Sequence, residues 1–243
     1  MISPSKLLKE NRWTQVVVLL LLLLLLGLAG VPGYLTGKWQ WKQPAPVTNI
    51  QKLIQIHQTG LSLPGWQTAE QGQQQVGEQK WSLQVIKKAD SQTQALLLLF
   101  PQRSPKDKPQ AEWSQISGWG RLRWGKWDIA QERSAEFTVK PARELGNQAE
   151  TRVEARFFRA STQQNTFAVL QWYAFPNGGN PSSLHWFLGD QLAQWRQHRT
   201  PWVSVSILIP IEPLGKVETV WPLAQSLGQT VQATLMAGPL ENS

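Results

Sequence analysis

The chain has 243 residues, 41% of them hydrophobic, and a formal net charge of +8 at pH 7. This length is enough for one large or two small domains with a real core. There is no cysteine, which excludes disulfides, thiolate metal sites and a cysteine nucleophile. After residue 42 the net charge is only mildly positive and the basic residues are scattered, which argues against nucleic acid as a partner. This charge is compatible with weak attraction to anionic lipid.

An unbroken apolar run, from Val16 to Leu26, is the first feature along the chain. Together with the uncharged residues up to Leu35 it reaches about twenty residues, the length that spans a bilayer as a helix. We therefore predict a transmembrane anchor over residues 16–35, preceded by a short cytoplasmic tail over residues 1–15.

A cleaved signal peptide is the alternative, because small residues at 27–29 have the spacing that a signal peptidase recognises. The long charged segment before the run and the aromatic residues after it, Tyr34, Trp39 and Trp41, favour a retained anchor. A slight excess of basic residues before the run predicts a cytoplasmic N-terminus and an extracytoplasmic domain. The anchor itself is expected in the cell membrane.

Residues 36–48 form a predicted linker that contains Pro44 and Pro46. Thr48 or Asn49 then caps a predicted helix that Gly60 ends. The strand at 81–86 alternates, with Trp81, Leu83 and Val85 on its expected buried face and serine and glutamine on the other. The apolar run at 95–100 predicts a central strand buried on both faces, followed by a polar loop over 101–110.

Tryptophans alternate with glycine and basic residues between Trp113 and Trp127. Such a pattern suits stacking on sugars or bases, cation–π contacts or a membrane interface. The chain has 14 tryptophans and two tyrosines, so tryptophan that fills a core is the simpler interpretation of this segment.

Two strands joined by a polar turn are predicted between Thr151 and Trp172, and the second lacks a polar face, which places it deeper in the sheet. A glycine turn over 177–181 follows. The end of this hairpin and several tryptophans are the candidates for contact with a partner: Trp66, Trp119, Trp124, Trp172, Tyr173 and Asn177.

Ser182 or Ser183 caps the next predicted helix, in which Leu184, Leu188, Leu192 and Trp195 form an expected core-facing stripe. A strand over 203–209 and a last helix over about 216–227 follow. This order predicts an α+β fold, with one domain over residues 49–243 in which helices pack on an antiparallel sheet.

No catalytic motif accompanies these elements. His57 and His198 are interpreted as cations at helix C-termini, and His185 and Asp190 lie on different helix faces. The acidic pairs Glu132 with Glu136 and Glu150 with Glu154 have spacings common on solvated surfaces. We predict no catalytic residue, no cofactor and no metal, and hence a protein that is not an enzyme; an enzyme of unrecognised type is the opposing hypothesis.

Several stretches resemble one family, the cyanoexosortase B system-associated proteins, which are membrane-anchored accessory proteins of cyanobacteria. The resemblance covers nearly the whole chain and is carried by VPGYLTGKWQW, TGLSLPGWQT, ARFFRASTQQNTFAVLQWYAFPNGGNP, DQLAQWRQHRTPWVSV and IPIEPLG. It implies a partner of an exosortase, an integral membrane cysteine peptidase that processes proteins with a PEP-CTERM-type sorting signal, in systems linked to exopolysaccharide production.

The resemblance implies that the chain assists the peptidase or presents its sorting-signal substrates, and no catalytic residues carry over. The missing cysteine excludes the peptidase role itself. The alternative is an extracytoplasmic polysaccharide-binding protein that uses the tryptophans of residues 113–127.

Overall fold

The computed structural model describes residues 13–25, 44–76, 78–89, 91–110, 127–140 and 150–241. The chain divides into two compact units, Met1–Pro44 and Ala45–Ser243. In the first unit, residues 13–25 form a helix. Its residues from Val16 to Leu25 are each 47–59% exposed, so that every side of this apolar helix is accessible.

The predicted anchor over residues 16–35 is described only as far as residue 25. Within the described ranges, no helix combines the length and the apolarity required to cross a membrane. Leu26 and Leu35 lie outside the described residues, whereas Val16 lies in the helix.

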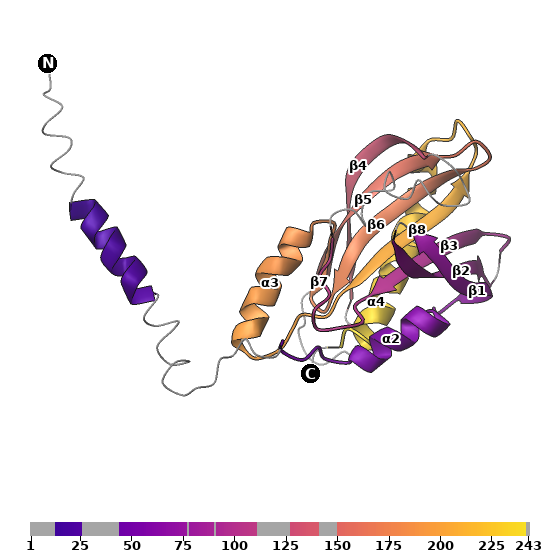
Figure 1. The fold of residues 1–243 in the computed structure, drawn as a ribbon. Coiled ribbons are helices and arrows are strands. Elements are labelled where there is room, and N and C mark those ends of the chain that lie inside the picture. The colour runs from indigo at the N-terminus through magenta and orange to yellow at the C-terminus, as the bar shows by residue number, and fades with distance from the viewer. Residues whose placement is uncertain are drawn as a thin grey trace, which may run out of the picture. The chain divides into compact units, whose positions relative to one another are not determined.

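Eight strands form a single sheet in the second unit (Figure 1). Their order in the sheet is β1-β2-β3-β8-β6-β7-β5-β4, with a further pairing between β6 and β5. Their bounds are β1 (Trp66–Val76), β2 (Gln79–Lys88), β3 (Gln94–Pro101), β4 (Asp128–Val139), β5 (Thr151–Ser161), β6 (Thr166–Phe175), β7 (Gly178–Asn180) and β8 (Val203–Ile211).

The predicted α+β class is confirmed, and the sheet departs from the predicted antiparallel arrangement at one point. Strand β7 runs parallel to β5, where Gly179 pairs with Val153, whereas all other pairings between these strands are antiparallel. The sheet is therefore mixed.

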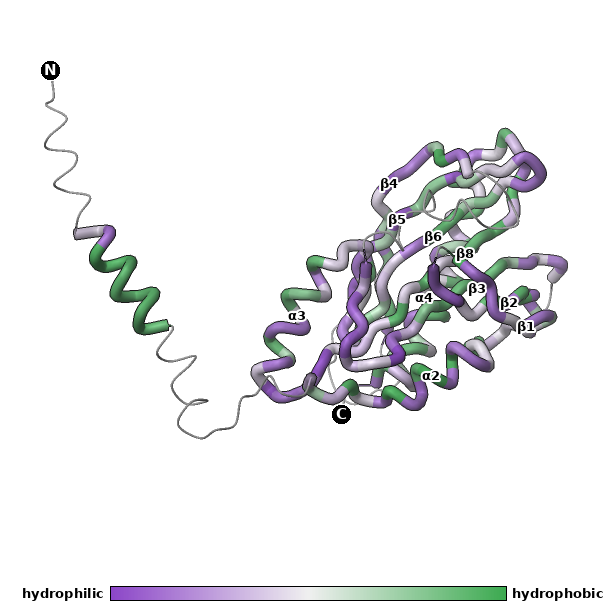
Figure 2. The backbone as a smooth tube through the Cα atoms, in the orientation of Figure 1, coloured by the Kyte–Doolittle hydropathy of each residue, from purple (hydrophilic) through white to green (hydrophobic). Residues whose placement is uncertain are grey.

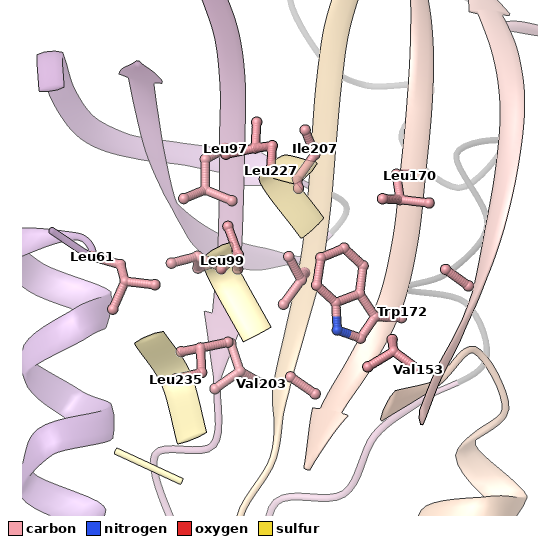
Figure 3. Packing of buried hydrophobic residues seen from close by; sticks show 14 of the residues in the cluster. Leu61, Leu97, Leu99, Val153, Leu170, Trp172, Val203, Ile207, Leu227 and Leu235 are labelled. Atoms are coloured by element: carbon pink, nitrogen blue, oxygen red, sulfur yellow. The ribbon is translucent and has the colours of Figure 1, made fainter. Parts of the chain in front are cut away.

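Helices lie on both faces of the sheet. They are α2 (Ile50–Thr59), α3 (Ser183–Trp195), the short 3₁₀ helix η3 (Val217–Val220) and α4 (Trp221–Ala237). One core cluster joins Leu53 of α2 and Leu227 and Leu235 of α4 to the sheet, as Figure 3 shows for α4 and its neighbours. A second cluster joins Trp186 of α3 to residues of the opposite sheet face.

Strand β6 explains why two cores are possible. All ten of its residues are buried, as predicted for the second strand of the hairpin. Its alternation sends Leu170 and Trp172 into the first cluster and Val169 and Tyr173 into the second. Tryptophan fills much of this interior, since Trp81, Trp172 and Trp202 are among its largest fully buried side chains.

Strand β1 was not predicted, because its sequence WQTAEQGQQQV has no apolar alternation and most of its residues are exposed. Backbone pairing with β2 along its whole length holds it in place. Strand β4, also unpredicted, pairs with β5 in the same way. Edge strands of this kind are stabilised by ladder hydrogen bonds, which a hydropathy pattern does not report.

The prediction for β2 was correct for Trp81, which is fully buried, and wrong for the opposite face. Ser82 and Gln84 are also buried, while Leu83 and Val85 are half-buried and Leu83 packs against the second cluster. The Gln84 amide makes this possible: its Oε1 accepts from Leu61 N at 2.7 Å and its Nε2 donates to Leu61 O at 3.1 Å. A buried amide whose hydrogen bonds are satisfied costs little.

The last helix ends ten residues later than predicted, because it continues past Gly228 to Ala237, and it begins at Trp221, after η3. A Cβ atom at Gly228 would lie 3.0 Å from Leu170 and 3.1 Å from Phe137. This glycine therefore allows α4 to approach the sheet closely and does not end the helix.

Candidate functional site

Helix α3 exposes a stripe of large apolar side chains. The helix and its cap were predicted correctly: Ser182 Oγ accepts a hydrogen bond from Leu184 N at 3.2 Å. The face of the helix that packs on the domain was predicted wrongly. The stripe expected to face the core is exposed, by 62% at Leu184, 59% at Leu188, 69% at Leu192 and 87% at Trp195. Figure 2 shows apolar and polar segments alternating along α3.

The buried face of α3 consists of Trp186, Asp190 and Ala193. Trp186 enters the second core cluster, and its Nε1 donates to Thr200 O at 3.0 Å. At 3.6 residues per turn, this face points directly away from the leucine stripe. Specific polar contacts, together with one large aromatic side chain, therefore decide which face is buried.

Asp190 and Arg199 form a buried ion pair, with side chains 1% and 7% exposed. Arg199 Nε donates to both carboxylate oxygens of Asp190, at 2.8 and 2.9 Å. Gln194 Nε2 donates to Asp190 Oδ2 at 2.7 Å, and the backbone N of Thr200 to Oδ1 at 2.9 Å. The carboxylate is thus compensated in charge and in hydrogen bonds, as burial of a charge requires.

Arg199 also connects α3 to two other segments. Its Nη1 donates to Pro105 O at 2.6 Å, in the loop after β3. Its backbone N donates to Pro46 O at 2.9 Å, and Val47 forms an isolated bridge with it. The chain therefore joins the domain beside the C-terminal end of α3.

A groove of about 980 Å³ lies between α3 and the end of the sheet formed by β5 and β7. The charged groups along it are partly engaged with one another. Arg152 forms ion pairs with Glu136 at 2.7 Å and Glu154 at 3.2 Å, and Asn180 Nδ2 donates to Glu154 Oε2 at 2.9 Å. We find no nucleophile with a base beside it among the groove residues.

Two glycines form one end of the groove. The sequence predicted a turn over 177–181, whereas the turn lies at Pro176 and Asn177 and both glycines belong to β7. Gly178 has a φ of 136°, and a Cβ atom on it would lie 2.5 Å from Arg152 O. A Cβ atom on Gly179 would lie 2.6 Å from Trp172 Cδ1. The glycines therefore allow β7 to insert between β6 and β5.

The structure separates the predicted partner-contact residues. Trp172 and Tyr173 are buried, with their side chains bonded to Gln232 Oε1 and Gln110 O inside the domain. Trp66 is half-buried against the first cluster, and Asn177 is exposed beside the groove. Trp119 and Trp124 lie outside the described residues, while Trp127, at the end of the same segment, is buried.

His185 and His198 both line the groove, whereas His57 lies apart from them. His57 is buried, and its Nε2 donates to Lys80 O at 2.7 Å, so it joins α2 to β2 and is not simply an exposed helix-end cation. His185 stacks on Phe175, and His198 lies at the turn after α3. In the ranges that the structure describes, no three His, Cys, Asp or Glu side chains form a group that could hold a metal.

Sequence reasoning missed the Asp190–Arg199 pair, since nothing in a nine-residue separation between an acid and a base marks them as buried. The periodicity of the leucines in α3 predicts a buried stripe, whereas the structure exposes it. Comparisons of the whole chain with protein-family models, with characterised proteins and with solved structures found no match.

Proposed function

We propose that this protein is a membrane-anchored, non-catalytic accessory protein of a cyanobacterial exosortase system. In this proposal, its extracytoplasmic domain assists the membrane cysteine peptidase or presents sorting-signal substrates to it, in support of exopolysaccharide production. The family assignment is supported by the sequence stretches that resemble the cyanoexosortase B system-associated proteins.

The exposed apolar helix over residues 13–25 is the observation that carries the membrane part of the proposal. Ten consecutive aliphatic side chains, from Val16 to Leu25, are each about half exposed. Exposed apolar surface of this extent is costly in water and favours transfer to an apolar phase. The uncharged sequence continues to Leu35, which brings the total to the length of a bilayer span.

An accessory role is also consistent with the side chains of the domain. The chain has no cysteine and so cannot supply the nucleophile of a cysteine peptidase. Two acidic residues of the pairs noted in the sequence form ion pairs, Glu132 with Arg156 and Glu136 with Arg152.

Deletion of the protein in a host that also makes the exosortase tests this function. We expect a reporter with the sorting signal to accumulate uncleaved, as in a strain whose exosortase lacks its nucleophilic cysteine, and the full chain supplied in trans to restore cleavage. Normal cleavage and surface display in the deletion strain would refute the proposal. The measurement is the ratio of precursor to processed reporter on immunoblots.

A further inference from the structure

Helix α3 exposes an apolar face that its own domain does not cover. Leu184, Leu188 and Trp195 lie within one narrow sector of the helix, flanked by Phe187 and Leu192. This sector is opposite the buried face of Trp186, Asp190 and Ala193. A helix with two apolar faces needs a second apolar environment.

The composition of the exposed face suits a lipid headgroup region. Asp190 is the only charged residue of α3, and its carboxylate is buried against Arg199. The exposed face combines leucine and phenylalanine with one tryptophan, and the exposed basic residue Arg196 follows the helix directly. Leucine, aromatic side chains and a neighbouring cation are typical of helices that lie in the interface of an anionic membrane.

The course of the chain favours a bilayer over other partners for this face. The domain begins beside the end of α3, where Arg199 N donates to Pro46 O. Residues 26–45 connect this point to the apolar helix over 13–25, and a connection of this length reaches at most roughly 70 Å when fully extended. A membrane that holds the apolar helix is therefore always within reach of α3.

We propose that α3 lies in the membrane interface, with Leu184, Leu188 and Trp195 in the headgroup region of the bilayer that holds the N-terminal anchor. This inference rests on the membrane anchor of the proposed function. In this arrangement the α3 side of the domain faces the membrane. Strand β1, on the opposite side of the domain in Figure 1, faces away from the membrane.

Single-cysteine labelling tests the inference on the full chain, which has no native cysteine. Gln191→Cys places an environment-sensitive fluorophore on the exposed side of α3, and Gln67→Cys places the same fluorophore on exposed β1 as a matched control. In vesicles of phosphatidylcholine and phosphatidylglycerol, we expect spin-labelled lipid headgroups to quench the probe at position 191 and not at position 67.

Equal, low quenching at both positions in a chain that floats with the vesicles overturns the inference and leaves the anchor intact. A chain that does not float with the vesicles overturns both. Quenching at position 191 that stays low while the probe emission shifts with protein concentration indicates contact between copies of the chain, which also overturns it.

A second variant separates membrane contact from internal stability. Leu188→Gln, Leu192→Gln and Trp195→Gln, combined with Gln191→Cys, should return the probe to water without changing flotation, while Leu214→Gln, at a leucine that is 91% exposed elsewhere, should leave quenching unchanged. Thermal unfolding in detergent should not change for either variant. A lowered midpoint for the triple variant would show that the face is covered within the protein and would overturn the inference.

Discussion

At the scale of single residues, buried polar side chains decide the arrangement around α3. Asp190 and Arg199 are the clearest pair, because together they connect α3, the loop at Pro105 and the point where the chain joins the domain. A buried ion pair contributes little net stability compared with an apolar pair, but loss of one partner leaves the other charge uncompensated.

Replacement of Asp190 should therefore strongly lower the stability of the domain. We expect Asp190→Ala to lower the free energy of unfolding by about 3–5 kcal/mol, because the Arg199 guanidinium remains buried without its partner. Glu136→Ala removes the exposed partner of Arg152 and serves as the control, with an expected loss below about 1 kcal/mol. Chemical denaturation of the detergent-solubilised chain, followed by tryptophan fluorescence, measures both. Equal losses would contradict the importance given to the buried pair.

At the scale of elements, α4 holds the end of the β6–β7 hairpin through one side chain. Gln232 is fully buried; its Oε1 accepts from Trp172 Nε1 at 2.8 Å. Its Nε2 donates to Phe175 O at 3.1 Å and Gly178 O at 2.9 Å. A single amide thus satisfies three buried groups on the hairpin and positions β7 at the groove.

The three hydrogen bonds of Gln232 predict that it contributes much more to stability than Gln229, another glutamine of α4. Gln232→Leu keeps the volume but leaves three buried polar groups unpaired, so we expect a loss of about 2–5 kcal/mol in the free energy of unfolding. Gln229 makes one exposed bond to Thr138 O, and Gln229→Leu should cost about 1 kcal/mol or less. Amide hydrogen exchange of residues 175–180 should accelerate only in the first variant; unchanged exchange there would count against this role of Gln232.

At the scale of the whole molecule, the proposed anchor predicts on which side of a membrane the domain lies. The basic residues before the apolar run predict a cytoplasmic N-terminus. In the proposed function, the domain that binds the exosortase and carries α3 lies on the side of the membrane opposite to the N-terminus.

Labelling in spheroplasts measures this topology. A membrane-impermeant maleimide should modify Gln67→Cys in intact spheroplasts and Ser5→Cys only after permeabilisation, because the two positions are expected on opposite sides. The native chain, without cysteine, is the blank. Labelling of Ser5→Cys alone in intact spheroplasts would reverse the predicted orientation, and labelling of both would refute the retained anchor.

Local pattern was sufficient for the elements that the core itself buries. The α+β class, the central strand at 95–100, the fully buried strand β6 and the cap at Ser182 were all predicted, because period-two alternation, unbroken apolar runs and capping residues are local consequences of burial and hydrogen bonding. The edge strands β1 and β4 were missed, since their stability comes from pairing with strands elsewhere in the chain.

Only the tertiary structure decided which face of an amphipathic element is buried. In α3 the leucine stripe was noticed in the sequence, yet Trp186 and the Asp190–Arg199 pair turn the opposite face inward. In β2 the face of Ser82 and Gln84, predicted to be solvated, is buried as well, because the Gln84 amide bonds to the backbone of Leu61. Hydropathy measures the gain from burying a side chain, whereas the choice between faces depends on polar partners distant in sequence, which fold into reach only with the whole domain.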